Sequence, residues 1–116
     1  MKLKDFDFRI WDNGKYYYPI KVNNDIVDIN LDIGVNAEIE LFTGLYDKNG
    51  KKIYEGDVII FDDIVHDTNR IGVIIKRHSG EFRLEFSKND TLGLRILNES
   101  ELLVIGNIHE NAGLLK

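Results

Sequence analysis

Residues 42–57 read FTGLYDKNGKKIYEGD and contain the end of one strand, a tight turn, a second strand and the start of a third. The centre is Asn49-Gly50, a pair typical of two-residue hairpin loops. Both residues tolerate the positive φ of a type I′ turn, so we expect that turn between Leu45-Tyr46 and Ile53-Tyr54. Glu55-Gly56-Asp57 is a second turn, which leads into the apolar strand 58–61. The stretch therefore predicts antiparallel β-structure.

Strand patterns also precede this stretch. Residues 6–11 alternate in period two, residues 12–15 form a turn, and the tyrosines 16–18 return from it, which predicts a first hairpin over residues 6–18. Pro19 cannot donate to a sheet ladder, so we expect this hairpin at a sheet edge. A shorter hairpin follows, with its turn at residues 23–25. A strand over residues 38–42 would place Ile39 and Leu41 on one face.

Strand patterns also dominate the second half of the chain. We expect strands at residues 71–76 and 81–87 around a turn at 78–80, then a loop at 88–93. Phe82, Leu84 and Phe86 alternate with charged residues and should point inward. Shorter strands are expected at residues 94–97 and 101–105, and the tail over 108–115 is expected to form one turn of helix.

Many short strands predict a mainly β fold. We expect a small SH3-like barrel over about residues 42–108, with a short C-terminal turn of helix. Residues 1–40 would be an N-terminal β-hairpin extension or a small lobe, and residues 41–116 the barrel core. No linker rich in Gly, Ser or Pro separates the two, so we expect them to pack together.

Composition narrows the class of protein. The chain has 116 residues, no Cys, one Pro and a net charge of −5. Without Cys there is neither a disulfide framework nor a thiolate metal site. The sequence shows no apolar run long enough for a membrane helix and no signal peptide, so we expect a cytoplasmic protein. Residues 1–69 hold 8 Lys/Arg and 14 Asp/Glu, whereas residues 70–116 hold 7 and 6, so any nucleic-acid surface should lie in the second part.

Three blocks of the sequence are similar to one family. They are residues 42–57, then VIGNIHEN at 104–111 followed by Leu114-Leu115, and FRIWD at 8–12. The chain resembles the YopX-like proteins of phages and prophages of Gram-positive bacteria. Leu41 departs from the polar residue frequent there, and Ala112-Gly113 departs from the usual Pro-Glu. The resemblance implies a phage or prophage context and a bacterial host cytoplasm, but no particular activity.

The shared blocks have a structural explanation. Gly44 and Gly56 fit backbone shapes closed to other residues, and Asp57 fits a side-chain bond to nearby backbone N–H groups. Glu110 and Asn111 are expected to cap the tail or bond backbone groups. The family-like motif residues are Thr43, Gly44, Asn49, Gly50, Glu55, Gly56, Asp57, Gly106, Asn107, Glu110 and Asn111.

Catalytic patterns are weak in this sequence. There is no nucleophile motif and no glycine-rich phosphate loop, so we expect no enzyme and no cofactor. Glu110 follows His109 and would orient it as a general base if the two side chains met. Because neighbours on a strand point to opposite faces, we do not expect a direct His109–Glu110 pair. The acidic loop could offer oxygen and imidazole ligands to Mg²⁺ or Mn²⁺, although a solvated loop explains it better. Its candidate ligands are Asp62, Asp63, His66 and Asp67.

Two other sets could bind partners. Trp11, Tyr16, Tyr17 and Tyr18 gather on the first hairpin, and they serve either as an exposed protein-binding surface or as a cap on the core. A basic set, Lys76, Arg77, Arg83 and Arg95, could hold single-stranded nucleic acid, but interleaved Glu residues favour a salt-paired face.

The sequence therefore favours a phage or prophage protein that acts as an interaction module, with a protein partner or a second copy of itself as the ligand. The alternative is a single-stranded nucleic-acid-binding module that uses the basic set. A metal-dependent enzyme centred on the acidic loop is the third hypothesis.

Overall fold

The computed structural model describes residues 7–22, 25–28, 36–111 and 113, with the side chains of 20–22 and 25–28 left aside. The described strands confirm a mainly β protein. The chain forms two compact units, residues 1–42 and 43–116. No helix in the described part of the chain is long and apolar enough to span a membrane.

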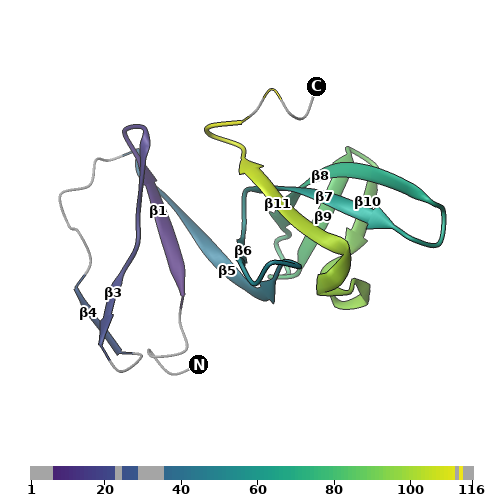
Figure 1. The fold of residues 1–116 in the computed structure, drawn as a ribbon. Coiled ribbons are helices and arrows are strands. Elements are labelled where there is room, and N and C mark those ends of the chain that lie inside the picture. Colours follow the sequence, from purple (N-terminus) through teal and green to yellow (C-terminus); the bar gives the residue numbers. More distant parts are fainter. Residues whose placement is uncertain (1–6, 23–24, 29–35, 112, 114–116) are drawn as a thin grey trace. The chain divides into compact units, whose positions relative to one another are not determined.

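The first unit is built from hairpins (Figure 1). β1 (Phe8–Asp12) pairs antiparallel with β2 (Lys15–Tyr17), and Asn13 and Gly14 both have positive φ, at 50° and 82°. Asn13-Gly14 is therefore a type I′ turn between β1 and β2. β2 is the edge strand, which agrees with the position of Pro19. β3 (Ile20–Val22) and β4 (Asp25–Asp28) form the expected short second hairpin, whose turn lies partly outside the described residues.

β5 (Glu38–Tyr46) is longer than the sequence predicted. Its first half pairs with β1, and its second half lies beside β6 (Lys52–Tyr54). Ile39 and Leu41 lie two positions apart in β5 and therefore share a face of the strand, as predicted, and Ile39 is 61% exposed on that face. Glu40, on the opposite face, is buried because its carboxylate pairs with Arg9.

The turn between β5 and β6 is not type I′ as predicted. Gly50 has a φ of 80°, but among the described residues other than glycine only Asn13 and Asp67 have positive φ. Gly50 donates its N–H to Asp47 and Asp47 donates its own to Lys51, which is the pattern of a type I turn followed by a left-handed glycine. The Asp47 carboxylate selects this longer loop by accepting hydrogen bonds within it.

The second unit contains a five-stranded antiparallel sheet of order β10-β9-β8-β7-β11. The strands are β7 (Asp57–Asp63), β8 (Thr68–Lys76), β9 (Phe82–Ser87), β10 (Asp90–Gly93) and β11 (Leu102–Asn107). The core cluster takes Ile59, Ile74, Leu84 and Leu102 from four of these strands and Ile53 from β6. Phe82 and Phe86 pack against it, so the inward alternation of β9 is confirmed.

Two further local predictions in this unit were wrong. Residues 90–93 form strand β10 instead of a loop, and residues 94–96 form the 3-10 helix η2 (Leu94–Ile96) instead of a strand. A second 3-10 helix, η3 (Glu99–Glu101), precedes β11. A 3-10 helix has three residues per turn, so Leu94 and Leu97 face the core together, an arrangement that strand alternation does not give. Residues 108–110 of the tail form a turn, and the expected helical turn over residues 108–115 lies partly outside the described residues.

Candidate interaction surface

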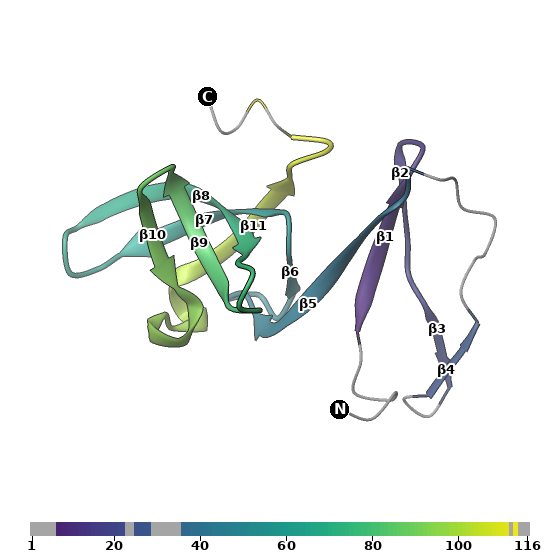
Figure 2. The same cartoon turned by 180° about the vertical axis from the view of Figure 1, so that it is seen from behind.

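The β7–β8 hairpin extends beyond β9 and β10, as Figures 1 and 2 show. Its tip is the turn Ile64–Asp67, so the expected acidic loop is shorter than predicted and its first two carboxylates belong to β7. Val65 is 86% exposed and Ile64 is 68% exposed. Large aliphatic side chains at this exposure gain nothing from folding, which makes the tip a candidate contact surface.

A groove of about 640 Å³, here called the hairpin groove, opens beside this tip. Apolar residues from four elements line it: Phe61, Val65, Leu92, Ile96 and Leu97. Phe61 belongs to the core cluster and Leu97 packs against it, whereas Ile96 is 73% exposed. The groove thus joins the core to two exposed aliphatic side chains.

Of the four titratable residues that line the groove, Asp63, His66 and Arg70 have ion-pair partners, and the fourth, Glu101, accepts the Asn98 N–H. His66 Nδ1 lies 2.7 Å from Asp63 Oδ2, and the His66 N–H donates to Asp63 Oδ1. Arg70 pairs with Asp90 and lies 3.8 Å from the Phe86 ring centre. Apart from Glu101, these charges satisfy one another, so the groove presents mainly apolar surface to a ligand.

The Asp63–His66 contact also affects the ionisation of Asp63. The hydrogen bond from His66 is the main reason why the pKa of the Asp63 carboxyl lies below its ordinary value, and it outweighs the opposing effect of desolvation. Asp63 therefore keeps its negative charge next to the exposed apolar residues.

The metal hypothesis gains no support from this geometry. Asp62 and Asp63 are neighbours on β7 and point to opposite faces of the strand. Asp63 is engaged with His66, and Asp67 is a turn residue with a φ of 52°. In the described part of the chain, these four residues do not bring three ligand atoms within 4.8 Å of one another.

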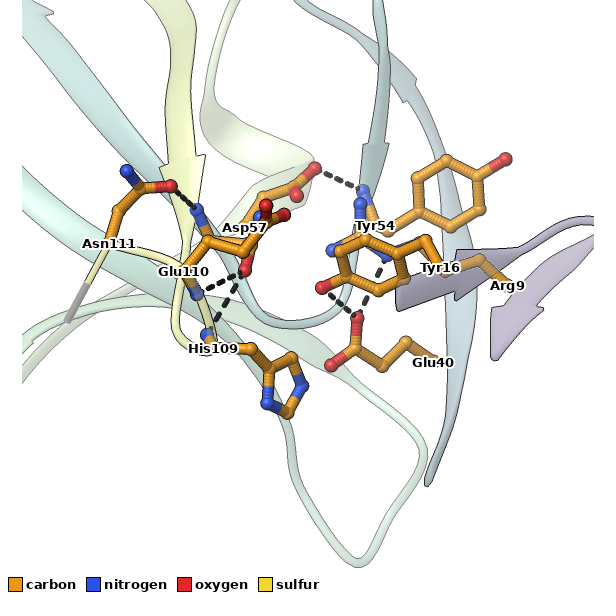
Figure 3. Close-up of polar contacts among 9 residues, drawn as sticks. Arg9, Tyr16, Glu40, Tyr54, Asp57, His109, Glu110 and Asn111 are labelled. Atoms are coloured by element: carbon orange, nitrogen blue, oxygen red, sulfur yellow. Dashed lines mark hydrogen bonds and ion pairs between the residues drawn. The ribbon is translucent and has the colours of Figure 1, made fainter. Parts of the chain in front are cut away.

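The aromatic set of the first unit is mostly engaged within that unit. Trp11 and Tyr16 face each other across the hairpin, with ring centroids 4.8 Å apart in an edge-to-face arrangement. The Arg9 guanidinium lies over Tyr16 at 4.2 Å, and Tyr16 donates to Glu40 (Figure 3). Tyr17 is half-buried, and Tyr18, at 53%, is the exposed member of the four.

The structure brings part of the basic set together. Arg77 and Arg83 both donate to the Thr91 hydroxyl, at 3.3 and 2.8 Å. Arg83 also pairs with Glu81, which agrees with the salt-paired face that the sequence favoured. Lys76 is exposed at the end of β8, and Arg95 lies on η2.

The family-like residues occupy turns and bulges. Gly44 and Gly56 both have a φ of 88°, and the Asp57 carboxylate accepts the Tyr54 N–H at 2.8 Å (Figure 3). Thr43 Oγ1 donates to the Ile53 carbonyl and accepts the Leu45 N–H beside the Gly44 kink. Glu55 lies in the turn before Asp57.

The second block folds around Asn107. Its side-chain oxygen accepts the N–H groups of His109 and Glu110, and its own N–H donates to Asn111 Oδ1. Asn107 Nδ2 donates to Glu110 Oε1. A Cβ at Gly106 would lie 2.4 Å from Asn111 Oδ1, so this turn requires the glycine. The block's glycine and polar side chains are thus used in local structure.

The sequence did not reveal the hairpin groove. Leu92, Ile96 and Leu97 were assigned to a loop and a strand, and a strand would have buried Leu94 and Ile96 together. The spacing of three between Leu94 and Leu97 was the available signal, because it fits a 3-10 turn that leaves Ile96 outside.

Comparison with known proteins places the chain in a family. The chain is similar to the solved structure of protein EF1440 from Enterococcus faecalis. The match covers 96% of this chain and 98% of the EF1440 chain, with 29% sequence identity and a TM-score of 0.62. The match to protein yopX from Bacillus subtilis covers 95% of this chain and 98% of the yopX chain, with 18% identity and a TM-score of 0.64. At this identity the match shows a similar fold. No curated protein matches this sequence. The family described as YopX protein matches residues 7–116, and the chain belongs to the YopX family.

Proposed function

We propose that this chain is a phage- or prophage-encoded, cytoplasmic interaction module that binds a protein partner or a second copy of itself, and that it is not an enzyme. The observation that carries the proposal is the hairpin groove, with Val65 and Ile96 exposed at its border. Membership of the YopX family supports the phage context that the sequence resemblance implies.

The surface chemistry supports a protein ligand. Interface cores are depleted in free charge and rich in large apolar side chains, and apart from Glu101 the charges that line the groove are paired internally. Exposed aliphatic residues that continue into a core-lined groove can bury apolar area at about 25 cal/mol per Å² on binding. The groove therefore suits aliphatic side chains of another polypeptide.

The same proposal includes an SH3-like architecture for the second unit. The antiparallel order β10-β9-β8-β7-β11 and the short 3-10 helix before the last strand support it. Small barrels of this kind serve many functions, so the architecture is compatible with a binding module without specifying its ligand.

The test compares the protein with a variant that carries Val65→Ser and Ile96→Ser. Light scattering over a range of concentrations gives the solution mass, and immobilised protein captures partners from a lysate of the bacterial host. We expect a discrete oligomer or a specific captured protein that the double variant loses. Ile39→Ser, at a similarly exposed site outside the groove, is the control and should change neither result.

A strictly monomeric protein that captures the same proteins with and without the double substitution would contradict the proposal. The same measurement with single-stranded DNA at low salt addresses the alternative function, for which the convergence of Arg77 and Arg83 on Thr91 is the supporting observation. A mass that increases only with DNA, and less so as salt is added, would favour nucleic-acid binding over the protein ligand.

A further inference from the structure

A second pocket lies on the other side of η2 from the hairpin groove. It has a volume of about 420 Å³ and is here called the Arg95 pocket. Thr43 and Leu45 of β5, Gly80 of the β8–β9 turn, Phe82 of β9, and Leu94 and Arg95 of η2 line it. The two pockets share no lining residue, because Leu94 and Arg95 face one and Ile96 faces the other.

The floor of the Arg95 pocket is apolar. Leu94 is buried, and Leu45 and Phe82 are half-buried against the core cluster. The Thr43 hydroxyl is satisfied within the chain by the Ile53 carbonyl and the Leu45 N–H. The floor can therefore bind an apolar group, and it has no unsatisfied polar atom that would need a hydrogen bond from that group.

The rim of the pocket carries an unmatched positive charge. Glu81 is held by Arg83 Nη1 at 2.8 Å, and Arg83 is held in turn by Thr91. Within the described part of the chain, the exposed Arg95 guanidinium has no hydrogen-bond or ion-pair partner. Since Glu81 is already occupied, Arg95 is available to an anion from outside, in a chain whose net charge is −5.

We propose that the Arg95 pocket binds the C-terminal residue of a partner polypeptide, with its apolar side chain on Leu45, Phe82 and Leu94 and its carboxylate on Arg95. Leu94 and Arg95 are adjacent in the sequence, so the ligand's apolar group and anion should also be close together. A C-terminal residue carries both on one Cα.

This inference rests on the proposed interaction role but uses a different site. Its test therefore needs neither the partner nor the hairpin groove. The probes are N-acetylleucine, which has the carboxylate, and N-acetylleucinamide, which has the same shape without the charge. Titrations are followed by the backbone amide NMR signals of the full chain.

We expect N-acetylleucine to shift the amide signals of Gly80, Phe82 and Arg95 with weak affinity, and the amide probe to bind about fivefold more weakly, as for loss of one partly exposed charged hydrogen bond. Arg95→Gln should weaken binding of the acid by about the same factor and leave the amide probe unchanged. Lys76→Gln is the matched control, since Lys76 is also exposed without a partner in the described residues but lies outside the pocket.

Equal binding of the two probes, no shift with either, or an unchanged affinity in Arg95→Gln would overturn the proposal. A capped peptide, acetyl-Gly-Leu-Asp-Gly-amide, that binds more tightly than N-acetylleucine would overturn the assignment to a chain terminus. The Val65→Ser, Ile96→Ser variant should bind N-acetylleucine normally, so that a failure of the hairpin groove and a failure of the Arg95 pocket give different results.

Discussion

The Asp47 carboxylate accepts a hydrogen bond from the backbone N–H of Val104 at 3.1 Å, across 57 positions of sequence. Its other oxygen accepts the N–H groups of Asn49 and Lys51 at 2.9 Å each. The Lys48 N–H donates to the Leu102 carbonyl beside it. One buried side chain thus shapes the β5–β6 turn and attaches it to β11, whose backbone would otherwise have an open edge there.

Replacing Asp47 by Ala should destabilise the second unit. The change leaves three backbone N–H groups without their acceptor in a buried place, and we expect a loss of about 2–3 kcal/mol in the free energy of unfolding. Urea denaturation monitored by circular dichroism measures it. Lys48→Ala in the same turn should cost far less, because its side chain is exposed and its backbone bond to Leu102 remains. Equal losses in the two variants would contradict this role of Asp47.

The same carboxylate predicts a pH dependence. Burial alone would raise the pKa of Asp47, but the N–H groups of Val104, Lys51 and Asn49 outweigh it and lower the pKa below its ordinary value of 3.8. A group whose pKa falls on folding stabilises the protein above its unfolded pKa and loses that contribution as the pH falls through its folded pKa.

The stability that Asp47 contributes should therefore be constant near neutral pH and decrease below about pH 4. Urea denaturation of the protein and of Asp47→Asn at several pH values between neutrality and strong acid measures the difference between them. Other carboxyl groups titrate in both proteins and cancel in that difference. A difference that stays constant into strong acid would show that the charge of Asp47 does not matter.

Gly72 on β8 should not accept a side chain. A Cβ there would lie 2.7 Å from the Glu85 carbonyl oxygen, 2.9 Å from Leu84 Cδ1 and 3.0 Å from Phe86 Cδ1. The backbone contact cannot be relieved by a rotamer change, so β8 and β9 would have to separate locally. We expect Gly72→Ala to lower the free energy of unfolding by about 1–3 kcal/mol, measured by thermal and urea denaturation.

Gly93→Ala is the control for this prediction. A Cβ at Gly93 would meet the ends of the Arg83 and Glu81 side chains at 3.3 Å, and its φ of −70° suits alanine. These flexible ends can move by a few tenths of an ångström, so we expect a small effect. A loss at Gly93 as large as that at Gly72 would refute the argument from backbone contact.

The ion pair of Arg9 and Glu40 makes a prediction for the first unit. Arg9 Nε lies 2.8 Å from Glu40 Oε1, and both side chains are 5% exposed. Arg9→Ala removes the cation that lies 2.8 Å from this buried carboxylate and should cost about 3 kcal/mol. Hydrogen exchange of the amides of β1 measures this unit separately from the second one.

The double change Arg9→Met and Glu40→Leu provides the comparison. It removes both charges and keeps side chains of similar length, so most of the lost stability should return. Protection of the β1 amides that is equally poor in the single and double variants would contradict the explanation by loss of this buried ion pair.

Local sequence chemistry determined the β-class, the turns and much of the strand register. Asn13-Gly14, Gly56 and the alternation of Phe82, Leu84 and Phe86 act within a few residues, so their effect can be predicted without the fold. The same local reasoning placed the type I′ turn at Asn49-Gly50, where Asp47 selects a different loop by bonding backbone groups.

The candidate surfaces depend on contacts that local patterns do not specify. Ile96 is exposed because η2 turns Leu94 and Leu97 onto a core formed by distant strands, and Arg95 is available because Glu81 is bound to Arg83. The sequence by itself determined which segments become strands and turns, since backbone preferences are local. Only the tertiary structure decided which charges are paired and which apolar side chains stay exposed, because pairing and burial depend on neighbours that are remote in the chain.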